Sequence, residues 1–177
     1  PTILLDKGTD DAHDNPVISM DAQGYLWIFS SSHGTGRPSF IHRSGEPYGI
    51  DNFEWILTSN FSYTQPWFLP DQGFLFPHTI YGAVGTDRTL AFTSSSDGFN
   101  WKQPEIYAAI EMGHYQVTCA NRGKVGVAFN MHPSPKGLNW RTNLYYMQTP
   151  DLGRSWYSVD GKALNTPLTT IENQALV

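Results

Sequence analysis

A pattern of about fifty residues recurs three times along the chain and constrains its fold more than any single motif. Each copy begins with a polar and aromatic tetrad, which starts at His13, Tyr63 and His114. A short apolar run, a Gly-containing turn and a second apolar run follow, and an Arg begins a third run. Several short runs within such a period are typical of β-propeller blades. The repeat therefore predicts an array of small antiparallel sheets.

The composition agrees with an all-β fold. The 177 residues include 12 Pro and 16 Gly, and 14% are aromatic whereas 15% are charged. No segment keeps the period of an amphipathic helix. The net charge of -5 argues against binding to nucleic acid or to an anionic membrane. No apolar run is long enough to span a bilayer. We predict neither nucleic acid nor membrane as a partner.

The repeat sets the expected domain organisation. Residues 1–177 should form one partial propeller domain, with four-stranded antiparallel blades at about 12–57, 62–108 and 113–160. Residues 169–177 are predicted to be the first strand of a fourth blade. Because propellers typically take four to eight blades to close, we expect the remaining blades in a longer parent protein. A small protein that closes its array by oligomerising is the alternative.

Two turns carry a recognisable motif. Residues 149–156 contain Thr-x-Asp-x-Gly-x-Ser-Trp, and residues 95–101 contain the same pattern shortened by one residue. The Asp can accept hydrogen bonds from backbone N–H groups, the Gly can take a positive φ, and the Trp can pack between blades. These turns resemble the Asp box, or BNR repeat, of sialidase-like propellers. That resemblance implies a sialidase-like propeller fold, but it does not predict an activity, which depends on the side chains of a particular site.

The first copy extends the resemblance. Residues 13–21 and 33–38 are similar to BNR-repeat proteins of polysaccharide-degrading bacteria, a group that includes seven-bladed ulvan lyases and a related rhamnosidase type. His13 and His33 match the spacing of a His pair that serves catalysis in those lyases. His78 stands where the family has a Tyr from the next blade, and Arg88 matches the family Arg. The resemblance implies a catalytic set of His13, His33, His78 and Arg88, and a seven-bladed parent.

Antiparallel pairing predicts where these groups meet. The start of a blade's first strand and the end of its second lie on the same face. His13, Tyr63 and His114 should therefore share a face with His33 and His78, and five of the six His residues are expected there. The predicted substrate-binding residues are Asn15, Arg37, Tyr63, Tyr81, His114 and Tyr115. Cys119, in an apolar run, is expected to be a small core residue.

These groups suit β-elimination of a uronate-containing, ulvan-like polysaccharide. His can transfer protons near neutral pH, and Arg can neutralise the uronate carboxylate in the enolate-like transition state. We therefore predict a polysaccharide lyase that needs no cofactor and no catalytic metal, although a structural cation remains open. We expect the protein to be secreted or periplasmic.

Two other functions remain open from sequence. The first is a glycoside hydrolase of the sialidase or rhamnosidase type. A retaining or inverting glycosidase normally uses two facing carboxylates, and the region offers Asp14, Glu111 and Glu172 without a convincing pair. A sialidase would instead need three Arg around a carboxylate and a Tyr nucleophile, and the set of Arg37, Arg88 and Arg141 resembles that only superficially. A non-catalytic glycan-binding propeller would use the same aromatic and His groups to bind sugar without cleaving it.

Overall fold

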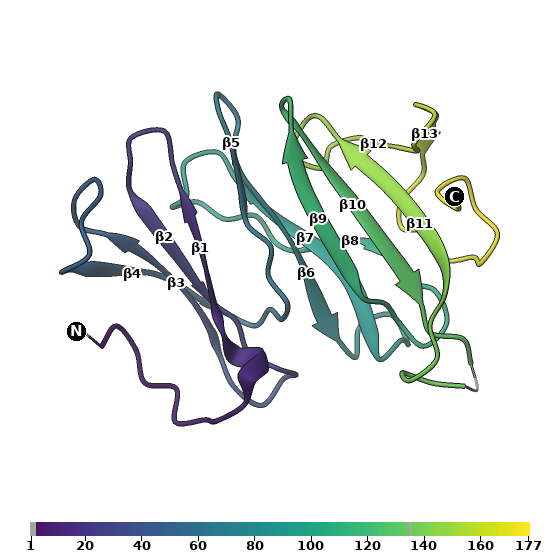
Figure 1. Ribbon diagram of the computed structural model, residues 1–177, viewed down its shortest axis with the longest axis horizontal. Coiled ribbons are helices and arrows are strands. Elements are labelled where there is room, and N and C mark those ends of the chain that lie inside the picture. The colour runs from purple at the N-terminus through teal and green to yellow at the C-terminus, as the bar shows by residue number, and fades with distance from the viewer. Residues whose placement is uncertain (1–2, 135) are drawn as a thin grey trace.

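Three antiparallel sheets lie side by side in the computed structural model, which describes residues 3–134 and 136–177 (Figure 1). The first sheet contains β1 (Pro16–Met20), β2 (Leu26–Ser30), β3 (Ser39–Ser44) and β4 (Phe53–Ser59) in that order. The second contains β5 (Trp67–Leu69), β6 (Gly73–Tyr81), β7 (Arg88–Ser95) and β8 (Glu105–Ala108). The third contains β9 (Gln116–Asn121), β10 (Lys124–Met131), β11 (Thr142–Thr149), β12 (Trp156–Tyr157) and β13 (Ala163–Leu164). The prediction of an all-β, antiparallel fold is confirmed.

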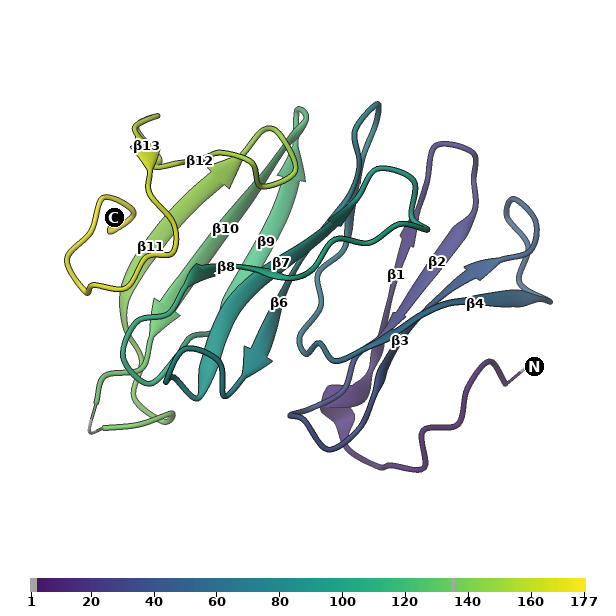
Figure 2. The same ribbon diagram turned by 180° about the vertical axis from the view of Figure 1, so that it is seen from behind.

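One short 3-10 helix, η1 (Ala12–Asp14), precedes β1. Within the described residues, no helix has the length and hydropathy that crossing a membrane requires. Each sheet is a meander, because strands that follow one another in sequence pair with one another (Figures 1 and 2). The connections between strands therefore lie alternately at one end of the sheet and at the other.

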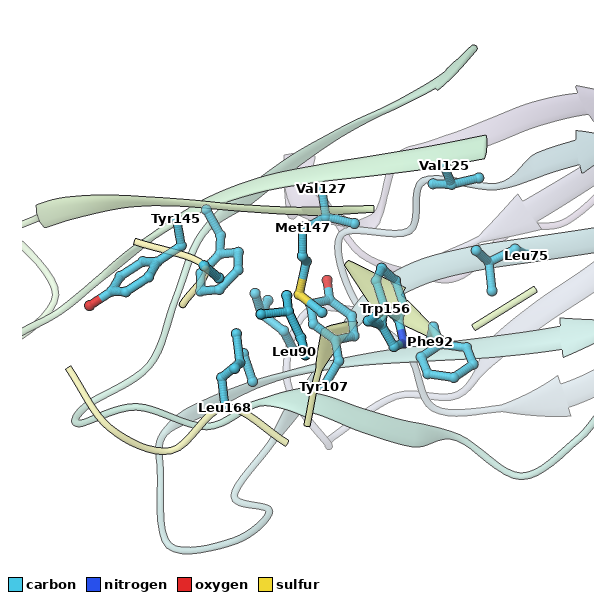
Figure 3. Close-up of a cluster of buried hydrophobic side chains, with 14 of the residues drawn as sticks. Leu75, Leu90, Phe92, Tyr107, Val125, Val127, Tyr145, Met147, Trp156 and Leu168 are labelled. Atoms are coloured by element: carbon cyan, nitrogen blue, oxygen red, sulfur yellow. The ribbon is translucent and has the colours of Figure 1, made fainter. Parts of the chain in front are cut away.

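Two hydrophobic clusters join the sheets face to face. Trp27 and Phe29 of the first sheet pack against Phe74 and Phe76 of the second, together with Trp101. A larger cluster fills the space between the second and third sheets (Figure 3). β10 shows why one face is buried, because its exposure alternates residue by residue and its apolar side chains face the second sheet.

The two Asp turns form as their sequences predict. Asp97 Oδ1 accepts hydrogen bonds from the backbone N–H groups of Phe99 and Asn100, both at 2.8 Å. Asp151 Oδ1 accepts one from Ser155 N at 2.9 Å. The Trp that ends the second turn, Trp156, packs between sheets. These turns lie between the third and fourth strands, at the end of the sheets where the β1–β2 and β9–β10 hairpins turn (Figure 1).

The turn glycines set how closely the sheets approach. Gly153 has φ +87°, and a Cβ at this position would overlap the ring of Phe92 from the second sheet. Gly98 has φ +79°, and a Cβ there would overlap the ring of Trp27 from the first sheet. Each turn is therefore held against an aromatic ring of the preceding sheet.

Residues 169–177 contain bends, a turn and one isolated antiparallel bridge, between Leu176 and Tyr145 of β11. Ala175 O accepts from Tyr146 N at 2.7 Å, and Val177 N donates to Leu144 O at 2.9 Å. That this segment begins a fourth blade stays a prediction. The expectation for Cys119 needs correction. Cys119 is exposed, since it lies on the face of β9 that points away from the second sheet.

His78 and His114 lie in the interior. β6 continues four residues beyond Pro77, to Tyr81, so His78 falls within the strand and not at its end. Its ring packs against Phe61 and Phe76, and its Nε2 lies 3.0 Å from Thr93 Oγ1. This burial contradicts the expectation that His78 opens onto the face of the site.

His114 is fully buried and both of its ring nitrogens are engaged. Nε2 accepts a hydrogen bond from Ile110 N at 2.8 Å, and Nδ1 donates to the Asn130 carbonyl at 3.0 Å. Burial lowers the pKa of His78 and of His114 to about 4 each. The two rings are therefore neutral structural groups.

Replacing Gly153 by Ala should destabilise the fold by about 2–4 kcal/mol, because the methyl group overlaps Phe92 and the backbone keeps a positive φ. Gly161→Ala is the matched control, since Gly161 has φ +82° and a Cβ there would meet no atom within 4 Å. It should lose about 1 kcal/mol from backbone strain alone. Urea unfolding measures both losses, and equal losses would contradict the close approach.

Burial of neutral His78 should make the fold sensitive to acid. The unfolded chain binds a proton near the ordinary pKa of 6.5, whereas the folded state resists protonation down to about 4. Stability is therefore complete above pH 6.5 and falls as the pH drops toward 4, by about 1–3 kcal/mol for this residue. His78→Leu should reduce that fall. Thr93→Val removes the same hydrogen bond but keeps the ring, so it should keep the full pH dependence in urea unfolding.

Candidate functional site

The ends of β2, β6 and β10 gather at one end of the three sheets, beside the segments that lead into β1, β5 and β9 (Figure 1, lower edge). His13 and His33 come from the first sheet, and Tyr63, Tyr81 and Arg88 from the second. Tyr115 comes from the third. These six residues form a continuous group, which we call the mouth cluster.

The His pair is built by η1 and the loop after β2. The His13 and His33 rings stack with their centroids 4.2 Å apart. Asp11, the N-cap of η1, lies between them. Its Oδ1 is 2.6 Å from His13 Nδ1, and its Oδ2 is 3.0 Å from His33 Nδ1. About half of the His13 side chain and a third of the His33 side chain are exposed, so both can reach a ligand.

Asp14 fixes the loop that carries His33. Its carboxylate accepts a hydrogen bond from His33 N at 2.7 Å and two from the Arg37 guanidinium at 3.0 Å each. Lys7 Nζ is 3.0 Å from Asp14 Oδ2. Arg37 and then Lys7 hold the pKa of the Asp14 carboxyl at about 2. Arg37, predicted to bind substrate, is thus engaged in holding this loop, and the predicted Asn15 is exposed at the end of η1.

Tyr81 and Arg88 are direct cross-strand partners in the β6–β7 hairpin. Arg88 Nε donates to Tyr81 Oη at 3.3 Å, and Tyr81 Oη donates to Tyr63 Oη at 3.4 Å. The Tyr81 ring lies 5.7 Å from the His33 ring, with the planes at 74°. Burial raises the pKa of Tyr63 far above its usual value, so Tyr63 keeps its proton.

Tyr115 joins the third sheet to this group. The Arg88 guanidinium lies 4.8 Å from the centre of the Tyr115 ring, and the Arg141 guanidinium lies 4.5 Å from it. The Tyr63 ring contacts Tyr115 edge-on at 5.6 Å. His132 is buried behind Tyr115, 5.3 Å between ring centres.

Arg88 carries a charge that no nearby carboxylate neutralises. Its side chain is almost wholly buried, yet among the described residues it forms no ion pair, and its Nη1 has no hydrogen-bond partner. Gly113, with φ +126°, lies directly against the Arg88 backbone: a Cβ there would be 2.7 Å from Arg88 Cβ. A buried guanidinium with free donors is suited to an anionic ligand.

The structure thus gathers some predicted residues and separates others. His13, His33, Tyr63, Tyr81, Arg88 and Tyr115 lie in the mouth cluster, whereas His78 and His114 lie in the interior. Sequence reasoning missed Asp11, although an Asp two residues before His13 is the pattern of a helix N-cap and could have drawn attention.

One group could hold a metal ion. Asp11, His13 and His33 each offer a ligand atom, and these atoms lie within 4.8 Å of one another. In this structure, both imidazoles are instead hydrogen bonded to the carboxylate, and Arg37 Nη2 lies 3.4 Å from the same Asp11 Oδ2. The guanidinium would repel a cation at that position.

Comparisons with solved structures support the architecture. The chain is similar to a PL25 polysaccharide lyase described as an ulvan lyase, and to the structure of such a lyase bound to -[GlcA(1-4)Rha3S]-. Each comparison has a TM-score of 0.76 and 18% sequence identity, and covers 90% of this chain and 43% of the lyase chain. The likeness shows a shared fold, and this chain spans less than half the length of those lyases.

No curated protein matches the chain. The family described as "BNR repeat-containing family member" matches residues 2–177, nearly the whole chain. The repeated sheets and their Asp turns therefore have a family context: this chain belongs to the BNR repeat-containing family.

Proposed function

We propose that the protein is a polysaccharide lyase that cleaves a uronate-containing, ulvan-like polysaccharide by β-elimination. The observation that carries this proposal is the buried, unpaired Arg88 beside Tyr81, within reach of the His13–His33 pair. The similar ulvan lyase structures, one of them bound to an oligosaccharide of glucuronate and sulfated rhamnose, support it.

Arg88 would bind the uronate carboxylate. The C5 proton of a uronate is weakly acidic until the adjacent carboxylate is neutralised, because its removal places more negative charge on that group. A guanidinium already desolvated by the protein stabilises the developing charge more strongly than one in water. Nη1 has no hydrogen-bond partner but is itself buried, so in this proposal the surrounding side chains move aside when the carboxylate binds.

His33 is the proposed base and Tyr81 the proposed acid. The imidazole removes the C5 proton, the C4–O bond breaks, and its electrons leave with the oxygen while a C4=C5 double bond forms. Tyr81 Oη donates a proton to the leaving oxygen, and Arg88 stabilises the phenolate through the hydrogen bond that its Nε donates. The Tyr63 hydroxyl, which accepts from Tyr81 in this structure, would turn its own O–H toward the phenolate once Tyr81 has lost its proton. His33 returns its proton to Tyr81 afterwards, and His13 stacks on the His33 ring.

The two alternatives have less support. Asp11 and Asp14 are the acids nearest to the His pair, and both are engaged by cationic or imidazole partners, whereas a hydrolase needs an acid and a nucleophile or base free to act. Glycan binding without cleavage would use the same groups, and only a turnover measurement separates it from lyase activity.

We also propose that further propeller blades complete the site. The outer faces of the first and third sheets expose apolar side chains, among them Ile18 at 63% and Val117 at 68%. Additional blades would cover those faces and supply the rest of a groove for a polymer. A seven-bladed parent that is secreted or periplasmic fits this proposal, because a polysaccharide substrate lies outside the cell.

The lyase proposal is tested with the full-length protein and a uronate polysaccharide such as ulvan, by following the ultraviolet absorbance of the unsaturated product. Wild type should generate that absorbance. Tyr81→Phe and Arg88→Lys should each lower kcat/KM by about 100-fold or more. The first removes the proposed acid, and the second replaces the guanidinium, which can donate two parallel hydrogen bonds to a carboxylate, by an ammonium, which cannot. Tyr48→Phe, at an exposed Tyr in the β3–β4 connection, is the control.

Other outcomes identify the alternatives. New reducing ends without ultraviolet absorbance would indicate a hydrolase. Retained binding without any cleavage would indicate a glycan-binding protein. Either result overturns the lyase assignment.

A second prediction concerns the position of Arg88. Gly113→Ala should displace the Arg88 backbone and lower kcat/KM by about 10-fold or more, since small displacements of a charged group reduce its stabilisation of the transition state. Gly82→Ala is the matched control, because Gly82 also has a positive φ (+67°) but has open space at its Cβ. Equal kinetics for the two folded variants would contradict this role of Gly113.

A further inference from the structure

We infer that Asp11 is a positioning residue: its carboxylate holds His13 and His33 together with both Nδ1 atoms protonated and both Nε2 atoms free to accept a proton. This inference rests on the proposed function for its catalytic consequence. Its structural content can be tested without any substrate.

The geometry of the carboxylate carries the argument. Each of its two oxygens faces a different imidazole, at 2.6 Å from His13 Nδ1 and 3.0 Å from His33 Nδ1. An ionised carboxylate only accepts hydrogen bonds. Both Nδ1 atoms must therefore be the donors, which leaves the lone pair of each neutral imidazole on Nε2.

The backbone fixes Asp11 in this position. Asp11 Oδ1 also accepts from His13 N at 3.0 Å, and Asp11 N donates to Thr9 Oγ1 at 3.1 Å. The hydrogen bonds from the His13 backbone and ring, followed by those from His33, hold the pKa of Asp11 well below its usual range. The carboxylate is thus ionised wherever the imidazoles can act as bases.

The other charged groups around the pair support an anion at this point. Arg37 Nη2 is 3.4 Å from Asp11 Oδ2, and Asp14 pairs with both Lys7 and Arg37 on the same side. Tyr63 contacts both imidazoles edge-on from the second sheet, and Tyr81 contacts His33. Within the described residues, Asp11 is the carboxylate that contacts the two rings.

The consequence for β-elimination is a base that is aligned before substrate binds. When His33 Nε2 takes the C5 proton, the ring becomes an imidazolium stacked on His13. Two positively charged rings with centroids 4.2 Å apart would repel each other, so His13 is expected to stay neutral while His33 carries the proton. The shared carboxylate stabilises that single imidazolium through the Nδ1–H bond.

Asp11→Asn separates this role from the capping role. Asn is as good an N-cap as Asp, so η1 should persist. The amide, however, has one acceptor oxygen and one donor nitrogen. It can accept from one Nδ1–H, but it forces the other imidazole to present an unprotonated Nδ1 or to lose the contact.

The decisive measurement is nitrogen-15 NMR of the His side chains in the full-length protein, with signals assigned through His13→Gln and His33→Gln. In wild type at a pH where both rings are neutral, both should be Nδ1–H tautomers. In Asp11→Asn, at least one should change toward Nε2–H, whereas Asp10→Asn, which removes an exposed neighbouring carboxylate, should leave both unchanged. Identical tautomers in wild type and Asp11→Asn would overturn the inference.

Kinetics on a uronate polysaccharide provide the second readout. Asp11→Asn should lower kcat by about 100-fold or more with little change in KM. His13→Gln, which keeps the Asp11–His33 contact, should lower kcat less than Asp11→Asn does. Asp11→Glu should recover part of the activity. An unchanged kcat in Asp11→Asn would count against a positioning role.

The experiments distinguish a failure of the lyase proposal from a failure of the inference about Asp11. If wild type cleaves no uronate polysaccharide, the lyase proposal fails while the tautomer measurement still decides the role of Asp11. If wild type is active and the tautomers do not depend on Asp11, the lyase proposal stands and this inference fails.

Discussion

The contact between a turn glycine and an aromatic ring of the preceding sheet determines how these sheets pack. Gly153 abuts Phe92 and Gly98 abuts Trp27, so no side chain separates turn from ring. Trp156 then fills the adjoining space. Because the same contact joins the first sheet to the second and the second to the third, the repeat produces a regular stack in which hydrophobic burial acts between units more than within them.

That packing also positions the mouth cluster, which lies at the opposite end of the sheets from these turns. No single sheet contains the mouth cluster: the His pair, the Tyr81–Arg88 pair and Tyr115 come from three successive sheets. A small rotation between sheets would separate His33 from Tyr81. The glycine contacts therefore help to set the distances between the His33 imidazole and the Tyr81 and Arg88 side chains, although the turns lie at the other end of the sheets. Close packing transmits such constraints because the interior resists compression.

The repeat allowed the all-β class, the hairpins and the shared face of His13, His33 and Tyr63 to be predicted, since these follow from strand alternation and antiparallel pairing. The position of His78 could not be predicted because the local sequence does not show where the second strand ends: β6 runs through Pro77 and on to Tyr81. His114 shows a second limit: a His before a strand can point outward or inward, and the local sequence does not reveal that Ile110 N and Asn130 O engage its ring. Asp11 escaped notice because its importance depends on His33, a partner distant in sequence.

Equivalent positions in the repeat have acquired different electrostatic environments. Arg88 begins β7, Arg141 directly precedes β11, and Arg37 lies two residues before β3, so each sheet has one guanidinium near the start of its third strand. Asp14 neutralises Arg37 and makes it a structural brace. Arg88 has no carboxylate partner among the described residues, and it is surrounded by the rings of Tyr81 and Tyr115. Aromatic faces offset the burial of a guanidinium without neutralising it. An anionic substrate would therefore meet an unneutralised guanidinium at Arg88 and a neutralised one at Arg37. The second sheet differs from the first because Arg88 lacks an acidic partner such as Asp14, and both sheets have the Arg itself.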